Sequence, residues 1–589
     1  MQSEIVWYRS ILVDRGTSVR MQLLLSKTGG AAAGGLLLGP DAVAAAREAR
    51  TEAGPRGMRR LWSLVALSLV VLLSVPFLLV DVPPVLDYPN HLARLFVLAH
   101  PEDPVLSQMY GPNWRILPNL GMDVIGAALL RVTDVHVGGR LLLALALFAP
   151  LVGVVAYHRA VFGRFSLWPL AAAVIAYNGI FLLGFMNFQL SLGLALLGAA
   201  GWVVLRRRAN VLVLAGFGAL AATATFLCHI LGLVFFAVLV GAAETDRLWR
   251  LRRSPDCMRE LVGAAGALAF AMIPSLVFYA LGPLSEPGAR PGPWLWQQKL
   301  WWIFTPFMTT STGLTLVTAC AVLALLVLIR RQLEVAPGLP LALAVLMLGF
   351  VAAPAKAING VYIDLRLALM MGLLLFAALQ PRLSARQGVY AGLLLGALTL
   401  LRCLDIGAGW IDHRRDLAEL RAALTQVEPG KRVLVANGEL DGIGDADKRE
   451  RTLPGVHRID THLAALLVIE RRAFWPLLFA NPAMQPVIVR PPFDRLAEAL
   501  GEPVEWRWLE HPDSSPGADI PTYLQRWRSD FDAVLVIGPP LKQQPVAGLL
   551  PLSRGSYVQL YRIERSSDSE MTSDGGNVRP GARRTGSNS

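Results

Sequence analysis

The chain has 589 residues, of which 54% are hydrophobic and only 17% are charged, and its formal net charge is +12. A chain with so much apolar sequence and so few charges is not an ordinary soluble enzyme. The basic residues lie in short clusters between apolar runs, not in a stripe interleaved with aromatic residues, so we expect no nucleic-acid partner. The composition instead indicates a polytopic membrane protein with a mainly helical fold.

The four cysteines stand at no spacing that metal sites use, and all precede the C-terminal region. They therefore indicate neither a disulfide framework nor a zinc site.

Residues 1–55 are predicted to be a poorly ordered leader because the stretch 29–49 is rich in Ala and Gly and lacks aromatic residues. The first apolar run, 61–80, is long enough to cross about 30 Å of hydrocarbon as a helix. Arg56, Arg59 and Arg60 precede it and favour a cytoplasmic N-terminus. A signal peptide is the alternative interpretation, but the run is long and no small-residue cleavage site follows it.

Further apolar runs bring the predicted total to about eleven transmembrane helices. They cover residues 141–157, 167–184, 187–205, 210–227, 230–243, 261–281, 311–329, 339–355, 364–380 and 387–402. When alternate loops are assigned to opposite sides, the arginine clusters all fall on the cytoplasmic side. The transmembrane domain is thus expected over 56–410, with a long first outer loop at 81–140 and an extracytoplasmic C-terminus.

The hydropathy changes after residue 410, and 411–565 is predicted to form an extracytoplasmic α/β domain. An amphipathic helix is expected at 411–424, and apolar strands are expected at 432–437, 486–490, 504–508, 533–538 and 557–563. Helical patterns between these strands favour a mostly parallel sheet. The Ser-, Gly- and Arg-rich stretch 566–589 is predicted to be a disordered tail.

The first outer loop holds the densest group of ionisable residues at membrane level, in the sequence DVPPVLDYPNHLARLF. If a helix begins near residue 90, His91 and Arg94 share one face, with Asp87 just before its first turn. A carboxylate there can accept a proton from an acceptor hydroxyl, while an arginine binds phosphate oxygens. The structural alternative is that Asp87 caps the helix and pairs with Arg94.

Other polar residues fall on the same expected side of the membrane. His229 lies between two apolar runs, and Asp364 and Arg366 lie at the start of another. Ionisable residues at membrane level are costly and usually face a cavity, so this grouping predicts a wet outer pocket. The alternatives are a satisfied interfacial histidine and charged anchors at a helix end.

Two other polar or aromatic segments have simpler interpretations. The tryptophan-rich stretch PGPWLWQQKLWWIF (291–304) indicates an interfacial belt, with a sugar-stacking platform as the alternative. The segments DGIGDAD (441–447) and HRIDTH (457–462) have neither calcium-loop nor zinc-helix spacing and are predicted to be solvated surface.

The order of these features resembles the bacterial membrane glycosyltransferases of the GT-C fold. The segments that carry the resemblance are LDYPNHLARLF (86–96), YGPNWRILPNLGMD (110–123) and NGIFLLGFMNFQLSLGLAL (178–196), together with the C-terminal domain. It is nearest an uncharacterised branch whose first outer loop contains DYPNHLAR. The resemblance implies a polyprenyl-phosphate-linked sugar donor, transfer at the outer leaflet, and a loop acid that acts as base or metal ligand.

On this resemblance, Asp87 matches the loop acid and Asp81 is its weaker companion, although the paired acids of the class usually stand adjacent or one residue apart. We expect Asp87 and His91 to be catalytic and Arg94 and Arg366 to bind phosphate. Asp81, His229 and Asp364 are expected to support them, and a divalent metal ion is an open expectation.

The leading hypothesis is therefore a glycosyltransferase-like protein of the bacterial cytoplasmic (inner) membrane that acts on an acceptor of the cell envelope. Its expected partners are a lipid-linked sugar donor and membrane lipids, and its oligomeric state stays open. The alternatives are a transporter or flippase of lipid-linked intermediates and a non-catalytic membrane protein of envelope assembly. A transporter predicts ionisable groups near the bilayer midplane and repeats of broken helices, whereas the charges here lie at the ends of the apolar runs.

Overall fold

A computed structural model describes residues 55–283, 292–357, 360–438, 451–453, 458–510, 521–538 and 546–564. The predicted leader (except Pro55), the acidic segment 441–447 and the predicted tail lie outside the described residues. By its internal contacts the chain divides into a large unit, 62–383 with 390–589, and a small unit, 1–61 with 384–389. The contacts discussed below are made within the large unit.

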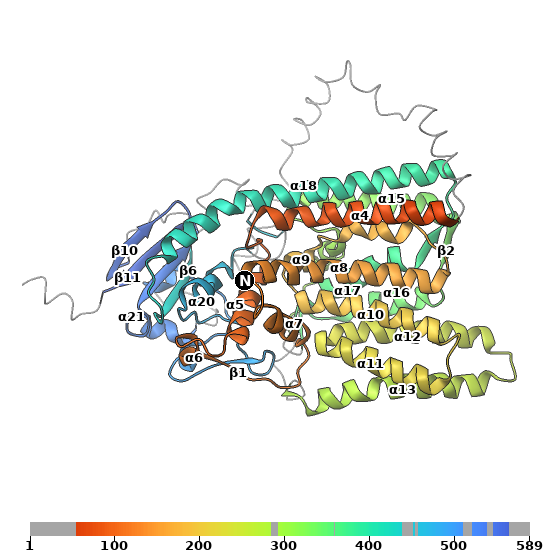
Figure 1. Ribbon diagram of the computed structural model, residues 1–589, viewed down its shortest axis with the longest axis horizontal. Coiled ribbons are helices and arrows are strands. Elements are labelled where there is room, and N and C mark those ends of the chain that lie inside the picture. Colours follow the sequence, from red (N-terminus) through yellow and green to blue (C-terminus); the bar gives the residue numbers. More distant parts are fainter. Residues whose placement is uncertain are drawn as a thin grey trace, which may run out of the picture. The chain divides into compact units, whose positions relative to one another are not determined.

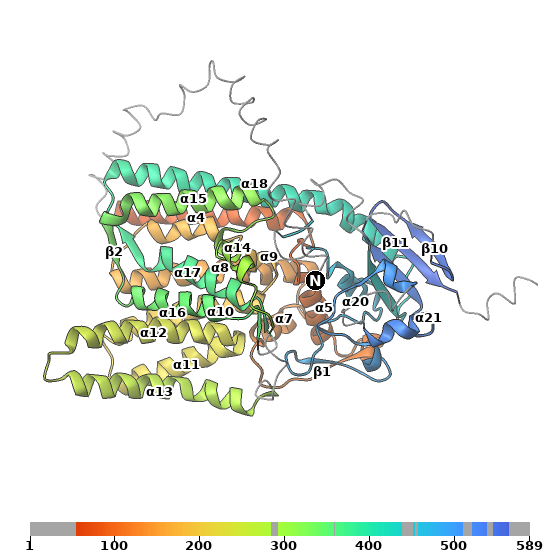
Figure 2. The same cartoon turned by 180° about the vertical axis from the view of Figure 1, so that it is seen from behind.

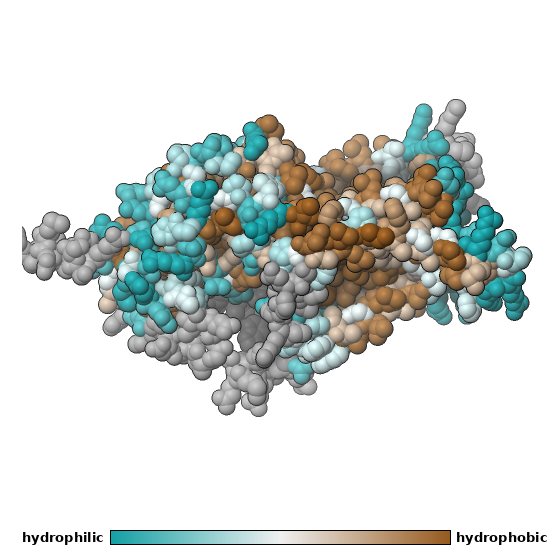
Figure 3. Space-filling view, turned by 90° about the horizontal axis from the view of Figure 1, so that it is seen from below, coloured by the Kyte–Doolittle hydropathy of each residue, from teal (hydrophilic) through white to brown (hydrophobic). Residues whose placement is uncertain are grey.

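Seven of the described helices are long and apolar enough to cross a membrane. They are α4 (Pro55–Leu79), α8 (Val135–Phe162), α10 (Met186–Leu205), α11 (Val211–Cys228), α13 (Cys257–Leu281), α15 (Thr312–Ile329) and α18 (Ala385–Leu424). Within the large unit, α8, α10, α11 and α13 run side by side (Figure 1). On the face shown in Figure 3, hydrophobic side chains cover the helical part and hydrophilic ones gather at its two ends. The chain is a multi-pass membrane protein, and the predicted helical bundle is confirmed.

Three further predicted runs form helices that are either too short or too charged to count among these seven. The run 230–243 belongs to α12 (Ile230–Leu251), whose last part carries Glu244 and other charged residues. The runs 339–355 and 364–380 form α16 (Leu339–Ala352) and α17 (Ile363–Ala377), with only 14 and 15 residues. A full crossing needs about 17 residues or more. The side chains of α17 are nearly all buried, whereas α16 exposes apolar side chains, among them Leu341 and Leu348.

The run 167–184 is not the helix that its hydropathy predicts. It forms a 3-10 helix, η1 (Trp168–Ile175), and a single turn, α9 (Gly179–Leu182), separated by irregular backbone. Asn178 caps α9, and Gly184 ends the segment in the left-handed region with φ of +85°. The side chains of 171–184 are mostly buried, so the apolar composition reflects protein packing and not exposure to lipid.

The arginine clusters gather at one end of the bundle, as the alternation of loops predicts. Arg206 and Arg247 both pair with Glu244 and Glu260. Glu334 receives arginines from two other loops, Arg164 and Arg382. Here β2 (Leu333–Val335) also pairs with β5 (Leu379–Pro381). Figure 2 labels β2 at this end of the bundle.

The C-terminal region is built on a five-stranded sheet of order β10-β11-β9-β6-β8. Its strands are β6 (Val433–Asn437), β8 (Val504–Glu505), β9 (Ala533–Ile537), β10 (Leu549–Arg554) and β11 (Val558–Ile563). The sheet is mixed and not mostly parallel: β6 pairs in parallel with β8 and β9, whereas β11 is antiparallel to β9 and β10. The short turn between β10 and β11 permits only an antiparallel pair.

Short helices lie in the segments that connect the strands of this sheet. They are η6 (Leu463–Ala465), α20 (Leu466–Arg471), η7 (Asp494–Leu496), η8 (Trp506–Leu509), η10 (Thr522–Arg526) and α21 (Trp527–Asp530). The predicted strand at 486–490 contains β7 (Val487–Val489), which leaves this sheet and pairs with β1 (Tyr110–Pro112) of the first long loop. The predicted helix at 411–424 is continuous with the last apolar run, because α18 has 40 residues without a break.

The first long loop is folded. Besides β1 it contains α5 (Tyr88–Ala99), α6 (Leu106–Met109) and α7 (Gly121–Leu129). The expected helix in this loop is confirmed and begins two residues earlier than predicted, with Pro89 in its first turn, where a proline costs no hydrogen bond. Its side chains are almost all buried, so α5 is part of the core.

Connecting segments supply the remaining elements. They are α14 (Trp296–Trp302), η3 (Thr305–Phe307), η4 (Arg330–Gln332), β3 (Lys356–Ala357) and β4 (Gly360–Val361).

Candidate functional site

Three sequence motifs that are far apart in the chain interlock around Asp87. The backbone N–H groups of Leu86 and Asp87 donate to the carbonyls of Leu182 and Leu183, at 3.0 and 3.2 Å. The third motif joins through Asn187, which accepts from the Met122 N–H at 2.8 Å and donates to the Asn119 carbonyl at 2.7 Å. These bonds fix the position from which the Asp87 side chain projects.

Gly184 makes the close approach to Asp87 possible. A Cβ atom added at Gly184 would lie 2.8 Å from the Asp87 nitrogen and 2.9 Å from its Cβ. The backbone there also has a φ of +85°, which side-chain-bearing residues rarely adopt. The site therefore requires a glycine at this position for two separate reasons.

Asp87 occupies the N-cap position of α5, but its side chain makes no capping hydrogen bond. Its carboxylate, with 13% of the side chain exposed, faces His462, and Oδ1 lies 3.3 Å from Nε2. The alternative that Asp87 caps the helix with its side chain and pairs with Arg94 is therefore wrong, since Arg94 pairs with Asp123. Asp87 is a partly accessible carboxylate at the meeting point of the first loop and the C-terminal region.

Asn90 determines which nitrogen of His462 carries hydrogen. The Phe479 N–H donates to Asn90 Oδ1 at 2.8 Å, which places the amide nitrogen on the opposite side. That nitrogen donates to the Leu477 carbonyl at 2.8 Å and lies 3.2 Å from His462 Nδ1. Because Nδ1 then accepts a hydrogen bond, the neutral ring carries its hydrogen on Nε2, the atom beside Asp87.

His462 is the residue that sequence reasoning missed. It belongs to HRIDTH, which was predicted to be solvated surface, yet Asp460, Thr461 and His462 are only 5–7% exposed. This prediction is wrong for 460–462, which are buried: Asp460 binds Arg458 with both carboxylate oxygens, and His462 contacts Asn90 and Asp87. A short polar segment without periodicity gives no signal of such burial.

Arg366 brings a second charge to the site. Its guanidinium contacts His229 through Nη1 and Nε2 and lies over the ring of Phe185, 4.2 Å from the centroid. Among the described residues no carboxylate lies within ion-pair distance of it, and its buried Nε has no hydrogen-bond partner. Phe185 directly follows Gly184, the residue that packs against Asp87, so Arg366 lies near that carboxylate. His229 also caps α12, since its Nδ1 accepts from the Leu231 N–H at 3.0 Å.

Asp364, two residues away, has a different environment. It forms a fully buried ion pair with Lys299 at 2.9 Å, and Lys299 also donates to the carbonyls of Phe350 and Ala353, both at 2.8 Å. Lys299 lies in the tryptophan-rich segment, so this pair attaches α14 to α17. Asp364 is thus held away from solvent by a partner that spacing did not indicate.

Arg94 lies in another buried ion pair. Its Nε is 2.7 Å from Asp123 Oδ1, with side chains 3% and 1% exposed. Burial raises the pKa of Asp123, and the positive charge of Arg94 opposes that rise. This pair joins α5 to α7. It also occupies the guanidinium of Arg94, which was predicted from the sequence to bind phosphate.

His91 lies beside the site on the same helix. Its ring meets Phe479 edge-on at 5.3 Å, and Phe479 meets His462 at 5.0 Å on another side. Burial, together with the charge of Arg94 and the nearby His462, lowers the pKa of His91 well below its ordinary value. His91 is therefore neutral near pH 7.

Asp81 is not grouped with Asp87. Its carboxylate pairs with Arg421 of α18 at 2.6 Å, and Arg421 also binds Glu470 at 2.8 Å. The side chain of Asp81 is 37% exposed. Burial acts to raise the pKa of Asp81, but the hydrogen bond and positive charge of Arg421 outweigh it and lower that pKa.

The residues that are described do not provide a metal-binding cluster. No group of three or more His, Cys, Asp or Glu side chains in the described ranges is placed to hold a metal ion. Asp87 and His462 are adjacent, but His462 presents a protonated nitrogen to the carboxylate, and a ligand needs a lone pair there. The residues that the structure describes at this site therefore do not fit the divalent metal that the resemblance leaves open.

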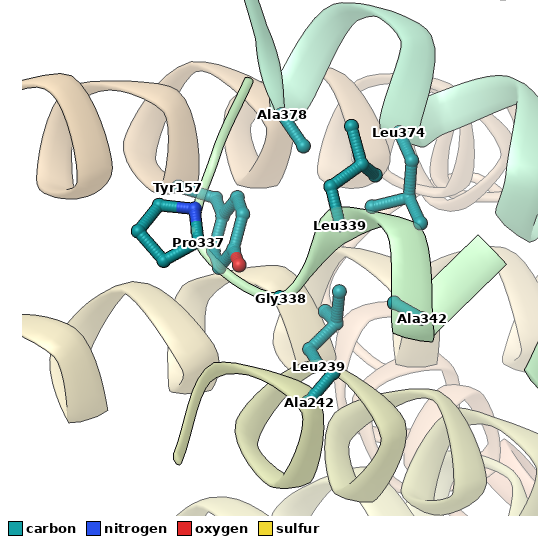
Figure 4. Close-up of a pocket in the computed structure, with 9 residues that line it drawn as sticks. All are labelled: Tyr157, Leu239, Ala242, Pro337, Gly338, Leu339, Ala342, Leu374 and Ala378. Atoms are coloured by element: carbon teal, nitrogen blue, oxygen red, sulfur yellow. The ribbon is translucent and has the colours of Figure 1, made fainter. Parts of the chain in front are cut away.

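A small cavity lies at the other end of the bundle, near the arginine clusters. It is lined by apolar side chains and the Tyr157 ring, including Leu239, Leu339 and Leu374, as Figure 4 shows. Its volume of about 10 Å³ is close to the minimum for one water molecule. It is a packing defect and does not belong to the candidate site.

These observations define a class: a multi-pass membrane protein with a polar site where its first long loop meets its C-terminal region. No protein-family model matches the chain, and no curated protein matches it. Among solved structures the chain is similar to the crystal structure of ArnT from Cupriavidus metallidurans in the apo state, with 12% sequence identity and a TM-score of 0.44. The match covers 85% of this chain and 98% of that one.

Proposed function

We propose that this protein is a membrane glycosyltransferase of the GT-C type that transfers a sugar from a polyprenyl-phosphate-linked donor to an acceptor hydroxyl. The observation that carries the proposal is the pairing of an accessible carboxylate, Asp87, with a fixed His462 N–H, close to the buried guanidinium of Arg366. This combination provides a base for the hydroxyl and a cation for the phosphate.

In the proposed reaction the acceptor oxygen attacks the anomeric carbon of the donor sugar. The new carbon–oxygen bond forms as the bond from that carbon to the phosphate oxygen breaks, and the leaving group is polyprenyl phosphate. Asp87 takes the hydroxyl proton and later releases it to solvent. The electron pair of the broken bond stays on the phosphate, where a positive charge stabilises it.

Arg366 is the proposed phosphate-binding residue. A buried guanidinium with no carboxylate partner retains its hydrogen-bonding capacity for an anion, and two charge-assisted bonds to phosphate oxygens would satisfy it. The ring of Phe185 holds its position. We assign Arg94 to the α5–α7 contact, since its charge is engaged by Asp123.

His462 and His91 have positioning roles in this proposal. The His462 N–H beside Oδ1 orients the Asp87 carboxylate, which leaves the second oxygen for the acceptor proton. His91, as a neutral ring beside Phe479, maintains the wall of the site on the same helix. Asp81 and Asp364 act at a distance as ion pairs that support the loop and α17.

The charge distribution supports an orientation. The arginine clusters of the large unit lie at one end of the bundle, and the positive-inside bias favours a cytoplasmic position for that end. Asp87 and the C-terminal region would then face the outside of a bacterial inner membrane, at the outer leaflet. The oligomeric state is not part of the proposal.

The proposal is tested by reconstituting the full chain with radiolabelled polyprenyl-phosphate sugars and candidate envelope acceptors. Asp87→Asn is expected to reduce kcat at least about a hundredfold, because the neutral amide cannot accept the proton. Asp81→Asn, whose carboxylate pairs with Arg421, is the matched control and is expected to retain transfer. Equal transfer by wild type and Asp87→Asn would exclude the proposed base. Movement of labelled lipid across the bilayer without product would favour a flippase.

A further inference from the structure

A groove separate from the candidate site opens at the arginine-rich end of the bundle, between α8, α10 and α11. Its volume is about 780 Å³, within the range of ligand-binding pockets. Three of its lining residues are arginines, Arg159, Arg207 and Arg208, and the others are apolar or small. The groove therefore combines cationic and apolar surface.

The three arginines differ from their neighbours in their pairing. Arg206 and Arg164, which flank the groove residues in sequence, pair with Glu244 and Glu334. In contrast, Arg159, Arg207 and Arg208 have no carboxylate within ion-pair distance in the described part of the chain. Arg159 stacks on Phe165, and Arg207 donates to the Ala160 carbonyl at 3.3 Å. Three uncompensated positive charges thus converge on one groove.

The apolar wall of the groove is partly exposed. Leu197 and Val204 are each 38% exposed on α10, which is one of the helices long enough to cross the membrane. Gly201 lies between them, and a Cβ added there would come within 2.3 Å of the Phe217 ring. This glycine lets Phe217 of α11 cover the floor of the groove. An exposed apolar wall beside cationic side chains suits a ligand that has both an acyl chain and an anionic group. A soluble anion would contact the arginines alone.

We propose that this groove binds an anionic phospholipid of the adjacent leaflet. The head-group phosphate contacts Arg159, Arg207 and Arg208, and an acyl chain lies along the wall formed by Leu197, Val204 and Phe217. Basic pockets between membrane helices on the positive side are suited to anionic head groups. The site does not depend on the proposed glycosyl transfer.

The test uses the full chain in zwitterionic detergent, titrated separately with phosphatidylglycerol, phosphatidylcholine and glycerol 3-phosphate. Binding is measured as the ligand-dependent rise in the unfolding temperature. Phosphatidylglycerol is expected to bind, and the other two probes are expected to bind at least tenfold more weakly. Since each arginine near an anionic lipid contributes about fivefold in affinity, the triple variant R159Q/R207Q/R208Q is expected to lose about a hundredfold.

A matched control removes the same charge elsewhere. The variant R252Q/R253Q/R331Q neutralises three exposed arginines that lie outside the groove and is expected to keep the affinity for phosphatidylglycerol. Val204→Trp tests the apolar wall and is expected to weaken phosphatidylglycerol without changing the net charge. Three outcomes would overturn the proposal: equal loss in both triple variants, equal binding of phosphatidylcholine, or glycerol 3-phosphate binding as tightly as phosphatidylglycerol.

Discussion

Asp87 precedes the first helix of the long loop and His462 belongs to the C-terminal region, yet their Oδ1 and Nε2 atoms are 3.3 Å apart. The candidate site is therefore built from both parts of the chain. The C-terminal region contributes a buried residue to it and is not only an appendage of the membrane helices.

We expect His462→Gln to lower kcat about a hundredfold while the fold is retained, since misplacing a reacting group by about 1 Å has an effect of that size. The measurement is the kcat of transfer as a function of pH, with the unfolding temperature as a control for folding. His136→Gln is the matched variant, because His136 lies 3.7 Å from Glu470 beside Arg421 and outside the proposed site. Wild-type kcat in His462→Gln would remove this residue from the mechanism.

Arg366→Gln is expected to change donor binding, whereas Arg94→Gln is expected to change the stability of the fold. Arg366→Gln removes an unpaired buried charge, so we expect a higher KM for the donor with little change in the unfolding temperature. Arg94→Gln leaves Asp123 buried without its partner and is expected to destabilise the fold by about 3–5 kcal/mol. Donor titrations and thermal unfolding of both variants check this contrast, which fails if the two variants behave alike.

Gly184→Ala is expected to destabilise the protein by more than about 1 kcal/mol, because its backbone has a positive φ and the added Cβ meets Asp87. Displacement of Asp87 should also lower kcat. Gly216→Ala is the control, since a Cβ at that helical position meets nothing within 4 Å. There, alanine is expected to be neutral or stabilising. Chemical unfolding of both variants gives the comparison, and equal stabilities would contradict the steric argument.

Acid is expected to destabilise the C-terminal region through Asp460. Burial alone would raise its pKa, but the charge and hydrogen bonds of Arg458 and a hydrogen bond from Tyr557 lower the pKa of Asp460 below its ordinary value. A carboxyl group with a lowered pKa in the folded state stabilises the fold above the pKa of the unfolded chain, about 3.9. This contribution is lost as the pH falls below about 4.

Unfolding of wild type and Asp460→Asn between neutral pH and pH 3 tests this expectation. The variant is expected to be less stable at neutral pH and to lose less stability on acidification. Asp494→Asn, an exposed carboxyl, serves as the control and should follow wild type. Parallel pH curves for wild type and Asp460→Asn would show that Asp460 contributes nothing to acid sensitivity.

Lys299→Met is expected to destabilise the protein by about 3–5 kcal/mol, because it leaves Asp364 charged and buried without a partner. The double variant with Asp364→Leu should recover most of that loss, since it removes both charges. The two single variants and the double variant, measured by thermal unfolding, form a complete cycle. Additive losses would show that the two charges do not interact.

The sequence predicted the helical bundle and the C-terminal strands well because both depend on local hydropathy. Four of the five predicted strands are present, whereas 504–508 is a strand only at Val504–Glu505 and continues as the 3-10 helix η8. In the described part of the C-terminal region, β10 was not predicted: its sequence contains Pro551, which is typical of an edge strand. The prediction of a membrane helix at 167–184 was wrong because hydropathy does not distinguish lipid from a protein interior. Hydropathy reports that a segment avoids water, and a buried irregular segment such as η1 with α9 satisfies that condition as well as a membrane helix does.

The site was only partly predictable for a different reason. The motifs that contain Asp87 and Asn187 were recognised separately, and their contact depends on backbone hydrogen bonds between distant segments. His462 and Lys299 make their decisive contacts with partners far away in the chain, Asp87 and Asp364. No local pattern around either residue contains that information.

Because Tyr110–Pro112 pairs with Val487–Val489, the first long loop can complete its fold only after most of the chain has been synthesised. The ribosome releases the first strand, and Asp87 with it, long before the second strand exists. Until then the edge of the first strand is unpaired and open to association with other chains. A chain that ends before Val487 would insert its helices but leave that edge exposed, so truncated products are expected to aggregate in the membrane. Coexpression of the missing C-terminal fragment should suppress that aggregation by supplying the partner strand.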